Sequence, residues 1–159
     1  MLWITRERPK IDRIACPWLI KRVVDTKAQF LFVPAAEVHE TAKRSGAIAY
    51  DVEGVELTHE GPLCSFDAIL KKYGLAEPAL GDLATIVRGA DTDKLNLAPQ
   101  CAGLLAISLG LSRLYADDHE QLAHGMVMYD ALYAWLKHAR GEKHDWNPQR
   151  GASAGGVKV

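Results

Sequence analysis

The sequence predicts an α+β fold, in which a small N-terminal parallel β-α-β-α-β sheet with an added edge strand packs on a C-terminal helical bundle. Between residues 2 and 51, short runs rich in β-formers alternate with helical segments, an order typical of parallel strands joined by right-handed crossovers. From residue 64 onward the pattern is almost entirely helical. The chain has 159 residues, of which 48% are hydrophobic, and this is enough for one domain with its own core.

The predicted strands are short. Residues 2–5, 29–33 and 47–51 are rich in aromatic and β-branched side chains, and we expect them to form the parallel unit. Gly54 then turns the chain into a fourth short strand over residues 55–59. We expect this strand to lie antiparallel at an edge of the sheet.

Two starting points are open for the first helix. Pro17 suits the first position of a helix that runs to about Asp25, with Cys16 near its N-cap. Alternatively, the helix begins near Asp12 and Pro17 kinks it. We favour the start at Pro17.

Prolines, glycines and polar caps bound the later helices. We expect these helices over residues 35–45, 65–73, 78 to about 88, 99–114, and 117 to about 140. In the last of them, Asp117 and Glu120 have the spacing of a capping box. Apolar residues repeat there at three and four, namely Leu122, Met126, Tyr129, Leu132, Tyr133 and Leu136. We interpret this face as core or as a dimer seam.

The domain prediction is a single unit over residues 3–140, followed by a mobile tail over the glycine-rich residues 141–159. The net charge is −1, so no overall field recruits nucleic acid or anionic membrane. Three cysteines without CxxC spacing favour reduced thiols and a cytoplasmic protein. No apolar run reaches the roughly 18 residues of a membrane span. The motifs of P-loop nucleotide hydrolysis, zinc proteolysis and serine hydrolysis are missing.

Charged side chains are densest just after the first strand. The group contains four cations and a cysteine, namely Arg6, Arg8, Lys10, Arg13 and Cys16. Guanidinium forks suit tetrahedral oxyanions, and a thiol among cations at a helix N-terminus should have a lowered pKa. The sequence therefore predicts an anion site formed by the four cations, with Cys16 as the candidate catalytic thiol. Alternatively, the cations form a solvated edge that pairs with neighbouring carboxylates.

A second polar group surrounds the turn before the helix at residue 65. His59 and Asp67 offer nitrogen and oxygen donors there, and Asp91 follows a later helix. Such donors suit a divalent transition metal of unspecified identity. We therefore predict a metal site formed by His59, Asp67 and Asp91. The ordinary alternative is that the two carboxylates complement helix ends and turns.

Four segments resemble the chromate-resistance domain at the C-terminus of ChrB-type proteins. They are residues 6–20, 58–67, 86–91 and 122–133, and the resemblance covers roughly residues 3–140. It implies an association with bacterial chromate resistance. Some members of the family look like regulators with an extra N-terminal region, and others are fused to rhodanese-like sulfurtransferase domains.

The resemblance also has local consequences. Other members carry histidine where this chain has Arg88, so the chain departs from the family at a position suited to a metal ligand. Because it starts at the family's strand around Trp3, we expect no nucleic-acid binding from this chain alone.

Three hypotheses follow. The leading one is a chromate- or oxyanion-responsive binding domain with a metal or redox centre, in which Arg6, Arg8 and Arg13 hold the anion. The second is a metal-dependent reductase or an enzyme that protects against oxidative stress. The third is a helical interaction module that pairs with a partner or with a second copy through the face around Met126 and Tyr129.

Overall fold

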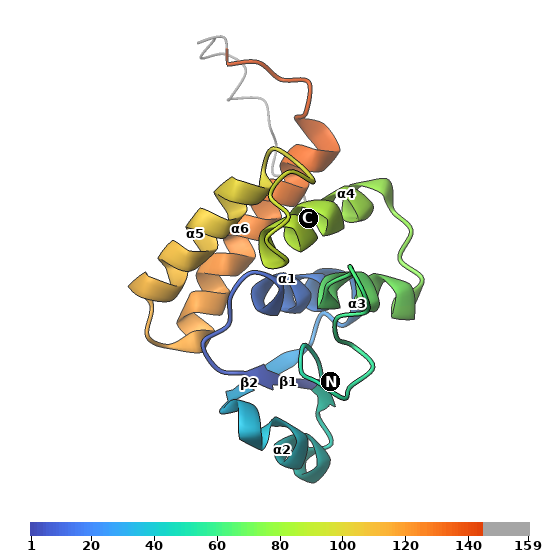
Figure 1. Cartoon of the computed structure of the whole chain (residues 1–159), viewed down its shortest axis with the longest axis vertical. Helices are drawn as coiled ribbons and strands as arrows, with labels where there is room; N and C mark the ends of the chain where they lie inside the picture. Colours follow the sequence, from blue (N-terminus) through green and yellow to red (C-terminus); the bar gives the residue numbers. More distant parts are fainter. Residues whose placement is uncertain (145–159) are drawn as a thin grey trace.

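The structure, a computed structural model, describes residues 1–144 and contains a small parallel sheet at the N-terminus (Figure 1). Its strands are β1 (Leu2–Arg6), β2 (Gln29–Val33) and β3 (Ile48–Ala49). The strand order is β2-β1-β3, with β1 parallel to both neighbours. The predicted α+β fold and its N-terminal parallel sheet are confirmed.

The first helix, α1 (Asp12–Leu19), continues into a π-helical turn, η1 (Ile20–Val24). The predicted start at Pro17 is therefore wrong, and the alternative start at Asp12 is right. Helical bonding is established before the proline, because the backbone N–H of Ala15 already donates to the Ile11 carbonyl at 2.9 Å. Burial favours this arrangement, since every residue of α1 except Arg13 is buried.

The second crossover consists of a 3₁₀ turn, η2 (Ala35–Glu37), and helix α2 (Val38–Ser45). The predicted antiparallel strand over residues 55–59 is wrong. In that segment Leu57 makes an isolated parallel bridge with Tyr50. The backbone of Asp51 is left-handed, with φ of 49°, and Gly54 has φ of 83°. Because of these two turns, residues 51–57 form a loop. An antiparallel strand would instead require a tight hairpin turn that reverses the chain direction.

Four further helices complete the fold. They are α3 (Ser65–Tyr73), α4 (Pro78–Asp91), α5 (Cys101–Leu114) and α6 (Asp118–His138). The predicted cap of the last helix is confirmed, since the backbone N–H of Glu120 donates to the Asp117 carboxylate at 2.7 Å. The apolar face of α6 is core, because Met126, Tyr129 and Tyr133 are buried within the chain.

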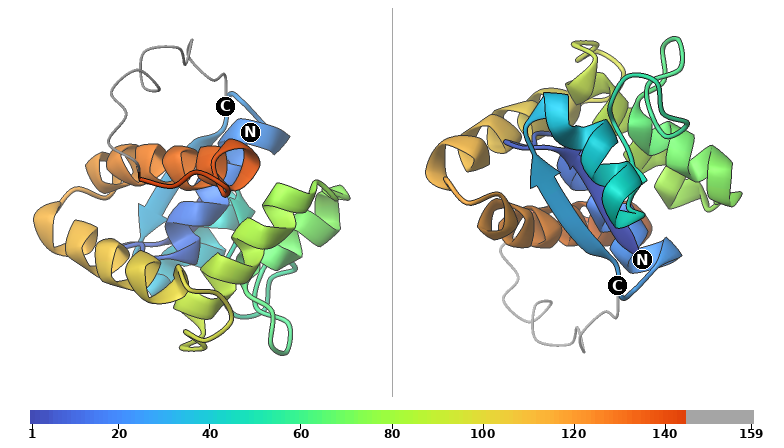
Figure 2. Two further views of the ribbon diagram at one scale, coloured as in Figure 1. Left: turned by 90° about the horizontal axis from the view of Figure 1, so that it is seen from above. Right: turned by 90° about the horizontal axis from the view of Figure 1, so that it is seen from below.

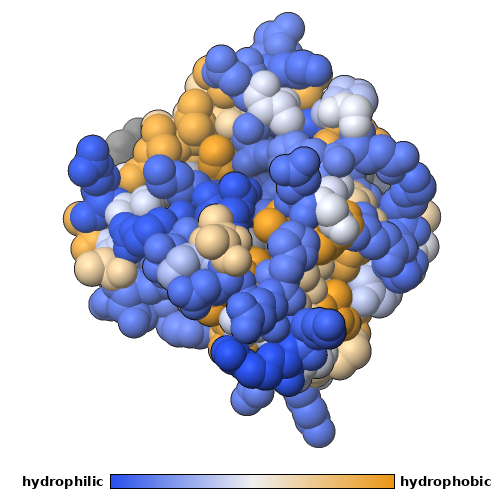
Figure 3. Space-filling model, turned by 60° about the horizontal axis from the view of Figure 1, so that its bottom comes forward, coloured by the Kyte–Doolittle hydropathy of each residue, from blue (hydrophilic) through white to orange (hydrophobic). Residues whose placement is uncertain are grey.

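The elements form layers. Helix α1 lies between the sheet and the helical half, whereas α2 covers the opposite face of the sheet (Figures 1 and 2). Helix α5 is an outer helix that packs on α4 and α6. The face on the side of α2 is mainly hydrophilic, with hydrophobic atoms gathered toward its upper left (Figure 3).

Two predictions concern the chain as a whole. Most of the predicted tail, residues 145–159, lies outside the described residues, so the single-domain boundary stays a prediction. None of the helices in the described part is long and apolar enough to cross a membrane.

Candidate functional site

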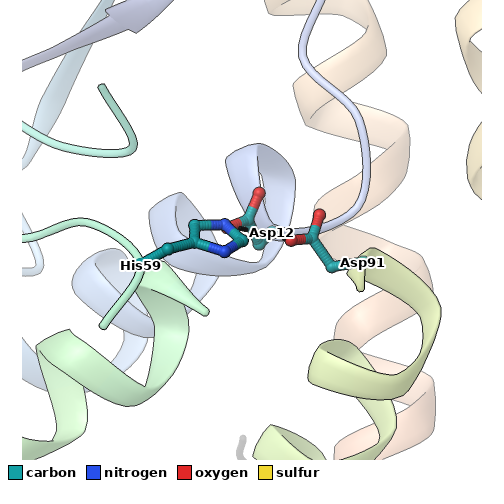
Figure 4. A group of neighbouring side chains, drawn as sticks. All are labelled: Asp12, His59 and Asp91. Atoms are coloured by element: carbon teal, nitrogen blue, oxygen red, sulfur yellow. Dashed lines mark ion pairs between the residues drawn. The ribbon is translucent and has the colours of Figure 1, made fainter. Parts of the chain in front are cut away.

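Three distant segments bring Asp12, His59 and Asp91 together (Figure 4). Asp12 is the first residue of α1, His59 lies in the loop before α3, and Asp91 is the last residue of α4. The His59 Nε2 atom lies 3.4 Å from Asp12 Oδ2 and 3.2 Å from Asp91 Oδ2. One ligand atom from each residue lies within 4.8 Å of the other two. This spacing is compatible with three ligands around one cation.

A third acidic group, Asp51, also faces His59, with its Oδ1 atom 3.4 Å from Nε2. Unlike the other two carboxylates, Asp51 has cationic partners of its own. Arg6 donates to it at 2.6 Å and the Arg13 Nε atom lies 3.3 Å away. The hydroxyl of Ser65 also donates to Asp51, at 2.8 Å. Arg6 and Arg13 therefore compensate the charge of Asp51, which borders the site.

The loop that presents Asp12 has a constrained backbone. Ile11 has φ of 44° and Arg8 has φ of 53°, and positive φ is rare for a β-branched residue. Helix α6 holds this loop in place, because the Tyr129 hydroxyl donates to the Ile11 carbonyl at 2.9 Å and Gln121 donates to the Pro9 carbonyl at 2.6 Å. Such backbone outliers persist where their surroundings fix them, and they cluster at functional sites.

Asp12 itself is 2% exposed, and within the described residues its Oδ2 atom has no hydrogen-bond donor. The Tyr50 hydroxyl is likewise buried without a partner in the described part of the chain. A buried carboxylate is costly unless a cation or hydrogen bonds compensate it. Among the described residues, the ion pair found for Asp12 Oδ2 is the one with His59.

The acidic surroundings shift the proton equilibria of the site. The close contact with Asp12, whose Oδ2 atom lies 3.4 Å from Nε2, is the main cause that raises the pKa of His59 to about 9. Burial opposes this shift, and the negative charges of Asp12, Asp91 and Asp51 reinforce it. Burial and then the charge of Asp12 raise the pKa of Asp91 to about 7. The pKa of Asp51 is also raised, first by burial and then by Asp12. At neutral pH the group therefore holds protons that a divalent cation could replace.

Cys16 and Cys64 are buried beneath this polar group. Burial, reinforced by the charge of Asp12, raises the pKa of both thiols. The expectation of a lowered pKa for Cys16 is therefore wrong. We expected a lowered pKa because a helix start at Pro17 would have placed Cys16 at an exposed helix N-terminus among cations.

The four cations predicted to bind an anion do not meet at one point. Arg6 and Arg13 converge on Asp51. Arg8 turns to the corner between α5 and α6, where its guanidinium donates to the carbonyls of Ser112, Tyr115 and Ala116 and pairs with Asp118. Lys10 is exposed, and no hydrogen bond or ion pair of its ammonium group is found among the described residues.

Of the three predicted metal ligands, the structure brings His59 and Asp91 together. Asp67 lies outside this cluster, because it accepts from the backbone N–H of Cys64 at 3.0 Å and pairs with Arg88 at 2.6 Å. Sequence reasoning did not assign Asp12 or Asp51 to the metal site. Asp51 is the last residue of the predicted third strand, and the carboxyl ends of parallel strands are where ligand sites usually form, so this signal was available.

Comparison with known proteins decides the family. The family model described as "ChrB, C-terminal domain" matches residues 3–136. The chain belongs to the ChrB C-terminal domain family. This confirms the resemblance found in the sequence.

A curated ChrB relative supports the same conclusion. The chain is 30% identical to Protein ChrB of Cupriavidus metallidurans over 139 residues, which cover 87% of this chain and 41% of that relative. The chain thus spans less than half the length of this ChrB protein. No solved structure matches the chain.

Proposed function

We propose that this ChrB-family domain contributes to chromate resistance by binding a divalent transition metal through Asp12, His59 and Asp91. The observation that carries the proposal is the buried Asp12 Oδ2 atom, which lacks a hydrogen-bond donor among the described residues and faces the donor atoms of the other two side chains. A cation at this point would compensate the charges of two carboxylates, Asp12 and Asp91. Among the described residues, the ion pairs found for these two carboxylates are those with His59.

The donor set favours a metal of intermediate hardness. Imidazole nitrogen suits zinc, iron, copper and nickel, and carboxylate oxygen suits manganese and magnesium. The neighbouring thiols of Cys16 and Cys64 have raised pKa values and are poor ligands in that state. Manganese(II), iron(II) and zinc(II) therefore fit best. Three protein ligands would leave coordination positions open for a further ligand.

We extend the proposal to a chromate-like oxyanion as that further ligand. Arg6 has a side chain that is 40% exposed, and it borders the cluster together with Arg13 through their shared partner Asp51. A doubly charged tetrahedral anion at an open metal position would gain from both guanidinium groups. Because three carboxylates also face the site, the anion would depend on the metal for its binding.

Metal binding is tested first. Natively purified protein is analysed for bound elements, and chelator-treated protein is titrated with manganese(II) and zinc(II) by calorimetry. We expect one equivalent to bind, and Asp12→Asn and His59→Gln to weaken binding at least about tenfold. Glu60→Gln is the matched control, because Glu60 is an exposed neighbour that pairs with Lys71. Variants with wild-type affinity and an unchanged circular dichroism spectrum would refute the metal site.

The anion is tested separately. Sulfate, a tetrahedral anion that does not oxidise thiols under these conditions, is titrated into metal-loaded and metal-free protein. We expect measurable affinity in the loaded protein only, weakened by Arg6→Gln and unchanged by Lys10→Gln. Equal sulfate affinity with and without metal would remove the metal-dependent oxyanion site and leave the metal proposal standing.

A further inference from the structure

We infer that the outer edge of β2 binds an extended acidic peptide of a partner protein, which adds to the sheet as a further strand. The binding surface is a groove of about 600 Å³ that lies between η1, β2 and the N-terminal half of α6, and we call it the β2 groove. Three of its features each define one property of the occupant. They are a free strand edge, an apolar floor and a local excess of positive charge.

The free edge requires an occupant with a peptide backbone. β2 is an outer strand, because the strand order is β2-β1-β3 (Figure 2). On its inner side the backbone N–H of Gln29 donates to the Met1 carbonyl at 3.0 Å. Since alternate residues of a strand face the same neighbouring strand, the N–H and C=O groups of Phe30 and Phe32 point outward. Among the described residues, no backbone hydrogen bond of these four groups to another element is found.

The groove reaches this edge from both faces of the sheet. Phe30 pairs in register with Trp3, and Leu31 pairs with Ile4. Paired residues share a face of the sheet and successive residues alternate between faces. Trp3 and Phe30 belong to the core cluster on the side of α1, so Leu31 lies on the opposite face. Because Phe30 and Leu31 both line the groove, the groove passes around the outer edge of β2.

The apolar floor defines the side chains of the occupant. Leu122 and Met126 lie one turn apart in α6 and line the groove beside Phe30. Both are mostly buried, and each is 8% exposed. In a peptide that adds to a sheet, every second side chain points to the same face. A peptide on β2 would therefore place apolar side chains on this floor at alternate positions, which is how strand addition gains specificity.

The charge of the groove defines the charge of the occupant. Its lining residues include Lys21, Arg22 and His119, and no carboxylate side chain is among them in the described part of the chain. Arg22 is compensated by Asp130 at 2.6 Å. The Lys21 ammonium has a long hydrogen bond to the Ala28 carbonyl, at 3.4 Å, and no ion pair for it is found within residues 1–144. A carboxylate of the peptide would compensate Lys21, so charge complementarity favours an acidic peptide.

Taken together, the three features distinguish a peptide from a small organic anion. Such an anion could use the apolar floor and Lys21, but it would not pair with the outward backbone groups of β2. For this reason we commit to a peptide. None of the three proposed metal ligands lines the groove, so the inference is independent of the proposed metal site.

The test begins with a phage-displayed library of random peptides, selected on the full chain. We expect the enriched peptides to carry at least one carboxylate and to have apolar residues at alternate positions. An enriched peptide is then synthesised with a fluorescent label, and its Kd is measured by fluorescence anisotropy. In the wild-type protein this peptide should protect the amides of Phe30 and Phe32 from hydrogen exchange.

Two substitutions test the edge and the charge. Phe32→Pro removes an outward N–H of β2, which proline permits on an edge strand, and Phe32→Val is the matched reference that lacks the ring but keeps the N–H. We expect the Kd to be about fivefold higher for Phe32→Pro than for Phe32→Val. Lys21→Glu should raise the Kd at least about tenfold. Lys43→Glu, at an exposed lysine of α2, is the control and should leave it unchanged.

Several outcomes would overturn the inference. They include a library that yields no enriched peptide, and a peptide that Lys21→Glu binds as tightly as the wild type. A peptide that does not distinguish Phe32→Pro from Phe32→Val, and does not protect the two amides, would bind without adding a strand. Decanoate that binds the wild type and is weakened by Lys21→Glu, with no peptide enriched, would identify a small organic anion as the occupant. Circular dichroism shows whether each variant is folded, and the exchange measurement does not depend on any variant.

Discussion

At the scale of single residues, His59 determines the electrostatics of the site. Its Nε2 atom faces three carboxylates at 3.2–3.4 Å, and two of them, Asp12 and Asp91, have no arginine or lysine ion pair among the described residues. This excess of negative charge around one imidazole agrees with the raised pKa values of His59 and Asp91, which are about 9 and about 7. The metal-free site is balanced by bound protons, and a metal ion must compete with them.

The first prediction concerns pH. Both groups bind protons more tightly in the folded than in the unfolded state, so their contribution to stability is present at low pH. It should be lost as the pH rises through about 7 for Asp91 and about 9 for His59. Thermal unfolding of metal-free protein should therefore show a falling midpoint between pH 6.5 and 9.

Metal affinity should change in the opposite direction. We expect the affinity for zinc(II) or manganese(II) to rise at least about tenfold over the same pH interval, because ligation requires deprotonated His59 and Asp91. Calorimetry in buffers of different ionisation enthalpy should detect released protons. Affinity that is independent of pH, with no proton release, would contradict the ligand assignment.

A second prediction concerns the thiols. All three cysteines have fully buried side chains in the described structure, and burial raises the pKa of Cys16 and Cys64. The thiolate is the reactive form, so the native protein should not react with a disulfide reagent such as Ellman's reagent on the time scale of minutes. Unfolding in guanidinium chloride should expose three reactive thiols. Rapid labelling of native Cys16 would show that the thiol is accessible and would revive it as a catalytic candidate.

At the scale of elements, local signals predicted the helices that have their own caps. The helix over residues 65–73 is confirmed at both ends, and the Asp117 cap is confirmed. The first helix was misplaced because proline is favoured at helix starts, whereas burial of its apolar residues fixed an earlier start at Asp12. Tertiary packing overrode the local preference there.

The same distinction explains how much of the site the sequence predicted. His59 and Asp91 could be chosen from their chemistry alone. Asp12 could not, because what brings it to them is the packing of α1 on α3 and α4, and spacing along the chain does not encode this packing. Asp67 has equally suitable chemistry, but Arg88 neutralises it.

The third prediction tests the packing of α1 on α6. Gly125→Ala would place a Cβ atom 2.3 Å from Ile14 Cγ2, so the Ile14 side chain or one of the two helices must shift. We expect a loss of about 1–3 kcal/mol in the free energy of unfolding, measured by denaturant titration. Gly81→Ala in α4 is the matched control, since its Cβ would meet no described atom within 4 Å. That change should be neutral or stabilising by up to about 1 kcal/mol. Equal effects of the two substitutions would show that the α1–α6 contact is not tight.

At the scale of the whole molecule, two segments after β1 connect the sheet to the rest of the fold. Helix α1 packs on α3, α4 and α6. The loop before it is anchored to α6 by Gln121 and Tyr129 and to the α5–α6 corner by Arg8. Since Asp12 directly follows this loop, the helical half of the molecule positions a ligand that belongs to the N-terminal half. The proposed metal site therefore depends on the docking of both halves.

Arg8 gives the last prediction, because the sequence assigned it to an anion and the structure places it on carbonyl oxygens. Its guanidinium donates to Tyr115 at 3.0 Å and to Ala116 at 2.7 Å, and its backbone N–H donates to Asp118 at 3.0 Å. Arg8→Lys cannot reproduce this fork of donors. We expect it to lower the free energy of unfolding by about 1–2 kcal/mol, because carbonyl acceptors lose partners. Sulfate affinity of the folded, metal-loaded protein should stay at the wild-type value, whereas Arg6→Gln should reduce it. A loss of sulfate binding in Arg8→Lys without a loss of stability would return Arg8 to the anion site, and the corner of α5 and α6 would then have to open in solution.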